Sequence, residues 1–184
     1  MSEPKMLALW DAYWPAMTAA IVIGVLVGAA AFRATPKMRA NTRAYRLRAA
    51  KLILPGAAVV LAIAAIWHGP AGTADRFAAS LERQSRDVLV NYEMTQVHAV
   101  IERGPLQRTI VLSGPADDFQ RTELVRIMNL VPGVGSVRWS DMNDSFALPL
   151  LAEAALGALA FFALGLLLAY LLELRRRYRM QWSW

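Results

Sequence analysis

The chain has 184 residues, of which 57% are apolar and 18% charged, and its formal net charge is +6. This composition is too apolar for an ordinary soluble domain of that length and is typical of a membrane protein. Because the chain contains no cysteine, disulfides, thiolate zinc sites, iron–sulfur clusters and covalent c-type haem attachment are excluded.

The first predicted element is a membrane-spanning helix over residues 15–32, which follows a short tail over residues 1–14. The span carries no charge and approaches the roughly 20 apolar residues that a bilayer requires. Trp10, Tyr13 and Trp14 precede it as an aromatic interface belt. Acidic residues precede the span and basic residues follow it, which is the reverse of a cleaved signal peptide. We therefore expect this helix to be retained.

The next segment, residues 33–51, contains seven Lys or Arg residues and no Asp or Glu. Beside soluble helices such a run would indicate nucleic acid binding. Between two apolar segments it indicates a short cytoplasmic loop that contacts anionic lipid headgroups, so no nucleic acid partner is expected. The residues that carry this prediction, together with those of a second basic cluster near the C-terminus, are Arg39, Arg43, Arg46, Arg48, Arg175, Arg176 and Arg177.

Two further spans are predicted, over residues 52–68 and 147–172, and a basic tail over residues 173–184 follows the last one. The second span is short and contains Pro55 and Gly56, so we expect a tilted or kinked helix anchored by its flanking side chains. A buried soluble helix is the alternative for that segment. The third span is the clearest, since residues 154–172 carry no charge.

Three crossings place the basic loop and the C-terminal tail on one side of the membrane and the remaining segments on the other. The N-terminal tail has a net charge of −1, and residues 71–145 have eight Arg against ten Asp or Glu, a net charge of −2. By the positive-inside rule, the N-terminus and the middle segment lie outside the cytoplasm. The expected location is a bacterial inner membrane with a cytoplasmic C-terminus and a periplasmic middle domain.

The middle segment, residues 71–145, is the only part long enough to fold as a soluble domain. Its apolar residues recur at helical or alternating spacing in turn, and glycine and proline separate the segments. The predicted order is helix, strand, strand, helix, strand, which makes the protein an α+β membrane protein. The predicted ranges are 77–92, 97–102, 109–113, 118–131 and 136–140.

Within this segment, residues 110–117, the amphipathic stretch 121–129 and residues 131–137 together resemble the BON domain. Gly114 matches the glycine that follows a strand in that family, and Val131, Pro132, Gly133, Val134 and Val137 match its turn into the last strand. The resemblance covers roughly seventy residues and implies a periplasmic module that binds proteins or phospholipid, without catalytic residues. It departs from the family in being single and held between membrane helices. Gly133 and Pro132 also have a plain structural role, since they end a helix.

No catalytic constellation is evident, and we do not expect an enzyme. His98, Ser113 and Asp117 are the only local residues that could form a triad, and their spacing indicates none. No cofactor is predicted, although His68 at the end of the second span is a candidate ligand for a haem or chlorin metal. Its alternative is a headgroup-level anchor, and Glu153 is expected to lie at the membrane interface rather than inside the membrane.

Small residues mark possible helix contacts. Gly24 and Gly28 are four residues apart, and Gly157 and Gly165 offer a similar groove on the third span. These faces serve either packing within the chain or docking on a neighbour. We expect a non-catalytic accessory subunit that packs against a larger complex of integral membrane proteins, such as a respiratory or photosynthetic assembly. The alternative is a stand-alone envelope protein whose middle domain binds phospholipid or periplasmic surfaces, and a pigment-contacting subunit is the third possibility.

Overall fold

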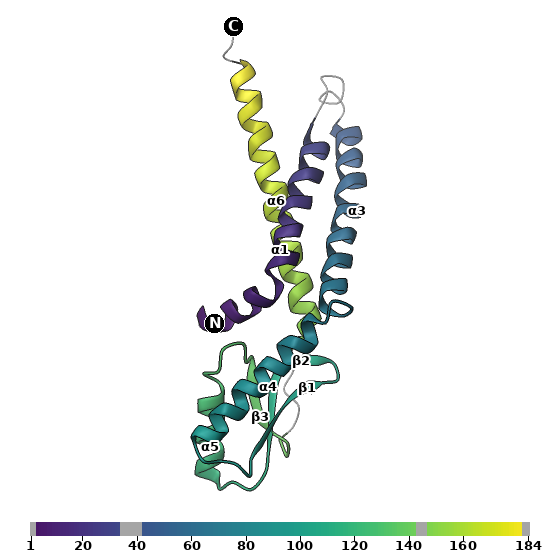
Figure 1. The fold of residues 1–184 in the computed structure, drawn as a ribbon. Coiled ribbons are helices and arrows are strands. Elements are labelled where there is room, and N and C mark those ends of the chain that lie inside the picture. The colour runs from purple at the N-terminus through teal and green to yellow at the C-terminus, as the bar shows by residue number, and fades with distance from the viewer. Residues whose placement is uncertain (1–2, 34–41, 143–146, 182–184) are drawn as a thin grey trace. The chain divides into compact units, whose positions relative to one another are not determined.

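A computed structural model describes residues 3–33, 42–142 and 147–181 (Figure 1). These residues form five α-helices and one three-stranded sheet, which confirms the predicted mixed class. Between the second and third apolar helices the observed order is helix, strand, strand, helix, strand, as predicted. In chain order the elements are α1 (Glu3–Phe32), α3 (Thr42–His68), α4 (Thr73–Asn91), β1 (His98–Arg103), β2 (Leu106–Ser113), α5 (Asp118–Met128), β3 (Ser136–Trp139) and α6 (Leu150–Gln181).

The helices α1, α3 and α6 are long and apolar enough to cross a membrane, which indicates a membrane protein. Each helix extends beyond its predicted apolar span. Helix α3 begins at Thr42, inside the predicted basic loop, and α6 continues through the basic residues after Leu172. Arginine is frequent in both extensions, and residues 42–51 also contain three alanines. Both residue types are among the best helix formers, so the helices continue past the apolar stretches. Pro55 lies within α3, which remains one continuous helix.

The chain divides into two compact units, residues 14–67 with 154–184 and residues 1–13 with 68–153. We call the first the helical unit. Its core is a cluster of buried side chains from α1, α3 and α6, with Ala20, Val60, Ala64, Ala158 and Phe162 at the centre. Small residues dominate this cluster, so the helices approach one another closely.

The αββαβ domain, residues 73–139 of the second unit, is built on a sheet with strand order β1-β2-β3. Strands β1 and β2 are antiparallel, with Ile101 opposite Ile110, whereas β3 lies parallel to β2, with Trp139 beside Leu112. These four side chains are buried, and strand alternation places them on one face of the sheet. Helix α4 packs against β1, and α5 packs against β3.

Two glycines of the predicted turns have backbone conformations that other residues rarely adopt. Gly114 has φ +134° and Gly133 has φ +91°. Helix α5 ends at Met128, three residues before the predicted end at Val131. Val131 and Val134 instead form a turn, in which the Val134 N–H donates to the Val131 carbonyl, and both side chains are buried. Pro132 therefore lies in this turn rather than directly after a helix.

Candidate functional site

The residues considered for a triad do not form one. His98 and Ser113 lie opposite each other on β1 and β2. The Asp117 carboxylate instead caps α5, where it accepts the Gln120 N–H at 2.7 Å while the Gln120 side chain accepts the Asp117 N–H at 3.0 Å. Over the described residues, no group of three His, Asp or Glu side chains is placed to hold a metal ion.

Among the described residues of the second unit, the least exposed ion pair joins β2 to the start of α6. Arg108 of β2 donates from Nη2 to Glu153 Oε1 at 3.1 Å, and its Nε lies 2.7 Å from Oε2. Nε and Oε2 are close, but their geometry is not that of a hydrogen bond, so the attraction between these two atoms is mainly ionic. The side chains are only 12% and 20% exposed. Glu153 is thus held by a specific cation, which the sequence did not predict because the two residues are 45 positions apart.

An open pocket of about 490 Å³ lies beside this ion pair. Thr109 and Ser136 line it, and their hydroxyl groups share a hydrogen bond of 2.9 Å. Arg108 also donates to the Gly133 carbonyl at 3.4 Å. The lining therefore combines the guanidinium of Arg108, the carboxylate of Glu153 and two hydroxyl-bearing residues with the apolar side chains of Ala147 and Leu148.

His68 forms a hydrogen bond of 2.7 Å between its Nδ1 atom and the Tyr13 hydroxyl. The two rings are also stacked, with centroids 6.2 Å apart, and Tyr13 is fully buried. This partner fixes the orientation of the imidazole ring. A pigment-ligand role for His68 stays a prediction, which absorbance of the purified His68→Ala variant would test.

The predicted small residues of the helices make close contacts within the helical unit. A Cβ atom on Gly165 would overlap the carbonyl oxygen of Ile21 and lie 2.9 Å from the Gly24 Cα. A Cβ atom on Gly28 would lie 2.6 Å from the Ala169 Cβ, and one on Gly157 would lie 2.6 Å from the end of the Met17 side chain. The two glycine pairs therefore serve the α1–α6 contact of this chain.

Part of the basic cluster also has partners within the helical unit. Arg177 donates to the Phe32 carbonyl at 3.0 Å and to Glu173 at 3.1 Å, so it neutralises the negative C-terminal end of α1. Arg48 donates to the Arg33 carbonyl at 3.5 Å. Arg43, Arg46, Arg175 and Arg176 are exposed, and Arg39 lies outside the described residues. The headgroup contact proposed for these residues stays a prediction.

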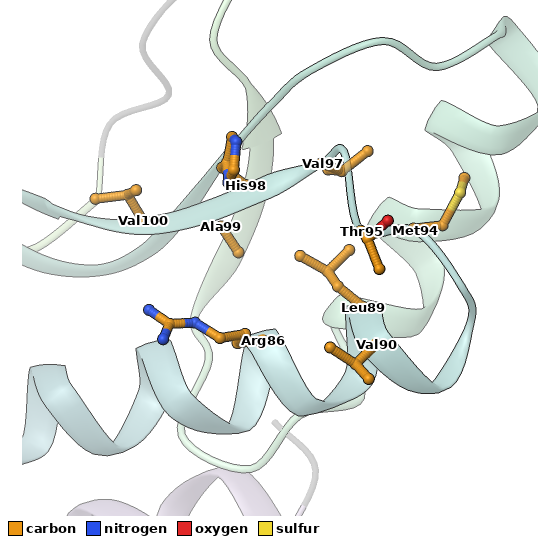
Figure 2. A pocket seen from close by; sticks show the side chains of 9 residues that line it. All are labelled: Arg86, Leu89, Val90, Met94, Thr95, Val97, His98, Ala99 and Val100. Carbon is orange, nitrogen blue, oxygen red and sulfur yellow. The ribbon is translucent and has the colours of Figure 1, made fainter.

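A second hollow, which the sequence did not reveal, lies between α4 and β1 (Figure 2). We call it the edge groove, and its volume is about 460 Å³. In Figure 2, Arg86 and Leu89 extend from α4 toward the strand, and Ala99 points back toward the helix. It is lined by Arg86, Leu89, Val90, Met94, Thr95, Val97, His98, Ala99 and Val100.

Comparison with protein-family models, with curated proteins and with solved structures found no match to this chain. The resemblance to the BON domain is therefore a prediction that rests on the residues quoted above.

Proposed function

We propose that this chain is a non-catalytic accessory subunit of a bacterial inner-membrane complex, with its helices packed on the complex and its αββαβ domain in the periplasm. The charge distribution supports this orientation, because both basic clusters would then lie in the cytoplasm. The BON-like turn around Gly133 supports a binding role for the domain.

The observation that carries the proposal is the small share of the helical surface that the chain buries by itself. Only 17% of the residues in the apolar stretch of α3 are buried, against 33% for α1. Helix α3 therefore has the smallest buried share of the three helices, since 22% of the apolar stretch of α6 is buried, and its uncovered apolar face is the one we assign to neighbouring membrane proteins. Its exposed apolar side chains are Leu47, Leu54, Val59, Leu61 and Ile66.

A non-catalytic role is supported by how the candidate polar groups are used. Asp117 is committed to capping α5, and Glu153 is committed to Arg108. Neither carboxylate is hydrogen-bonded to His98 or His68, so neither is positioned to orient an imidazole base for nucleophilic catalysis.

The size of the particle extracted in mild detergent from its native membrane tests the subunit role. We expect the chain to migrate with other integral membrane proteins at several times its own 20.3 kDa mass. Enlarging the exposed α3 face with Leu54→Phe should reduce this co-migration severalfold. Leu26→Phe on α1 is the matched control, since Leu26 is similarly exposed. A stable monomer or small homo-oligomer of the native chain would contradict the proposal.

The orientation is tested separately by inserting a topology reporter at Gly104. This residue is exposed in the turn between β1 and β2, and a Cβ atom there would meet no atom within 4 Å. We expect a periplasmic signal, and a cytoplasmic signal would reverse the topology.

A stand-alone envelope protein that binds phospholipid is the second candidate, and the pocket beside Arg108 favours it. A phosphate there would compete with Glu153 for the Arg108 guanidinium, and Thr109 and Ser136 would be its neighbouring hydroxyl groups. We would expect the purified chain in nanodiscs to retain anionic phospholipid over phosphatidylcholine, and Thr109→Val to reduce that preference severalfold. Equal retention of the two lipids would exclude this candidate.

A further inference from the structure

Strand β1 is an edge of the sheet, and part of its backbone has no strand beside it. On β2, the Arg108 and Leu112 carbonyls accept hydrogen bonds from Gly135 and Ser140, on the β3 side. Backbone groups alternate in direction along a strand, so Ile110 and Leu112 both face β3. Ala99 lies opposite Leu112. The N–H and C=O of Ala99 therefore point away from β2, toward the open edge.

The neighbouring part of the same edge is already covered. Ile101, which lies opposite Ile110, donates its N–H to Glu82 Oε1 of α4 at 3.3 Å. The Glu82 carboxylate also accepts two hydrogen bonds from Arg103, at 3.1 and 3.2 Å. Side chains thus block strand addition at Ile101, as is usual for edges that proteins protect. Within the described residues no such cap covers Ala99.

The uncovered part of the edge coincides with the edge groove (Figure 2). Val90 on one side and Val100 on the other are 56% and 52% exposed, so apolar surface flanks the open backbone. Arg86 extends into the groove, and no Asp or Glu lines it. The groove therefore combines unpaired strand groups, apolar walls and a positive charge.

We propose that the edge groove binds an extended acidic segment of a partner protein, which adds to β1 as a fourth strand. Main-chain hydrogen bonds to Ala99 would hold the segment, and alternate side chains would face α4. An acidic side chain among them would pair with Arg86. This inference rests on the proposed function and names the surface through which the αββαβ domain meets its partner.

The test uses the full chain in nanodiscs and a short acetylated peptide of alternating valine and glutamate. We expect the peptide to bind and to slow amide exchange at Ala99, while the same peptide with lysine in place of glutamate does not bind. Arg86→Glu should weaken binding by about tenfold or more, equivalent to ~1.4 kcal/mol. Arg83→Glu is the matched control, because Arg83 lies on the same helix but does not line the groove.

The backbone contribution is tested by Ala99→Pro, which removes the outward N–H without removing a bond to β2. We expect this variant to lose binding. If it fails to fold, Arg86→Glu still decides the charge argument and Ala99 exchange still decides the backbone argument. Three results would each overturn the inference. The acidic peptide does not bind, the Arg86→Glu and Arg83→Glu variants bind it equally, or the Ala99 amide is already protected by self-association without peptide. None of these results depends on how large a particle the native membrane yields, so failure here is distinguishable from failure of the subunit role.

Discussion

The helical unit and the αββαβ domain achieve close packing by different means. In the helical unit, α1 and α6 touch backbone to backbone at Gly24 and Gly165. In the domain, large side chains such as Trp139 and Leu112 fill the space between the sheet and its helices. Lipid is as apolar as the helix surface, so burial does not drive helix association in a membrane and shape must do so. In water, removal of apolar surface stabilises the domain directly.

The largest expected effect comes from Gly165→Ala. The added Cβ atom would overlap the Ile21 carbonyl oxygen, and backbone atoms on a packed helix cannot move aside. We expect a loss of about 3 kcal/mol, the upper end for overpacked sites, measured by unfolding in detergent followed by circular dichroism.

Gly157→Ala is its matched control. The same helix gains the same methyl group there, but the atom it meets is the end of the flexible Met17 side chain. We expect this variant to lose less than about 1 kcal/mol, because gap-filling methionine adapts. Equal losses for the two variants would show that α1 and α6 do not depend on a backbone contact at Gly165.

In the αββαβ domain the corresponding glycine variant is Gly114→Ala. Gly114 has φ +134°, and a Cβ atom there would lie 2.5 Å from the Gln96 carbonyl oxygen. Backbone strain of this kind costs about 1–3 kcal/mol, so we expect a loss of about 2 kcal/mol. Amide exchange at Ile110 and Leu112 measures it. Gly104→Ala should leave exchange unchanged, since nothing lies near that position.

The features that could be predicted from the sequence are those that depend on residues close together along the chain. The three apolar helices and the helix and strand order of the middle domain were predictable, because they depend on local periodicity. Gly114 and Gly133 were identified as turn residues from their neighbours. The pairing of Gly24 with Gly165 was left open between internal packing and docking, because spacing along one helix does not reveal which helix faces it.

The site residues were harder to predict, for the same reason. Arg108 and Glu153 were each visible as charges, but their pairing joins a strand to a distant helix. Arg86 had no distinguishing neighbour in the sequence, and only the fold places it beside the open edge of β1. Helix extensions over residues 42–51 and 173–181 were missed because charge patterns predict membrane boundaries rather than helix ends.

Arg108→Met tests whether ion pairs, as well as apolar packing, stabilise the domain. Removing the guanidinium leaves the Glu153 carboxylate largely buried without its cation. A fully buried pair would lose about 3–5 kcal/mol; with the observed partial exposure we expect a loss of about 2 kcal/mol, measured by urea unfolding. The double variant Arg108→Met with Glu153→Leu should recover most of this loss. A double variant as unstable as the single one would show that Arg108 acts through other contacts, such as Gly133.

A smaller effect is expected at the start of α5. Asp117→Ala removes the side chain that accepts the Gln120 N–H, and loss of such a cap costs about 1 kcal/mol. Asp118→Ala is the control, because Asp118 is the first residue of the helix and is not its cap. Amide exchange in the first turn of α5 should rise in the first variant only. The contact of α1 with α6 depends on glycine backbone packing instead, so the experiment sharpens the distinction between the two regions.

The smallest effect is a pH dependence confined to the surface of the αββαβ domain. Arg121 donates to Asp141 at 2.6 Å and lies 4.8 Å from the Trp139 ring centroid. The hydrogen bond from Arg121 lowers the pKa of the Asp141 carboxyl below its usual value. Because the folded pKa is depressed, the stabilisation is present above the unfolded pKa of about 3.9 and is lost as the pH falls through the lower folded value.

Exchange of the Trp139 indole N–H, which donates to the Arg121 carbonyl at 3.3 Å, should rise slightly over that range in the native chain. In the Asp141→Asn variant, exchange of this indole N–H should be faster already at neutral pH and should not depend on pH. The contacts of the helical unit around Gly165 involve no titrating group, so amide exchange there should not change with pH in either protein.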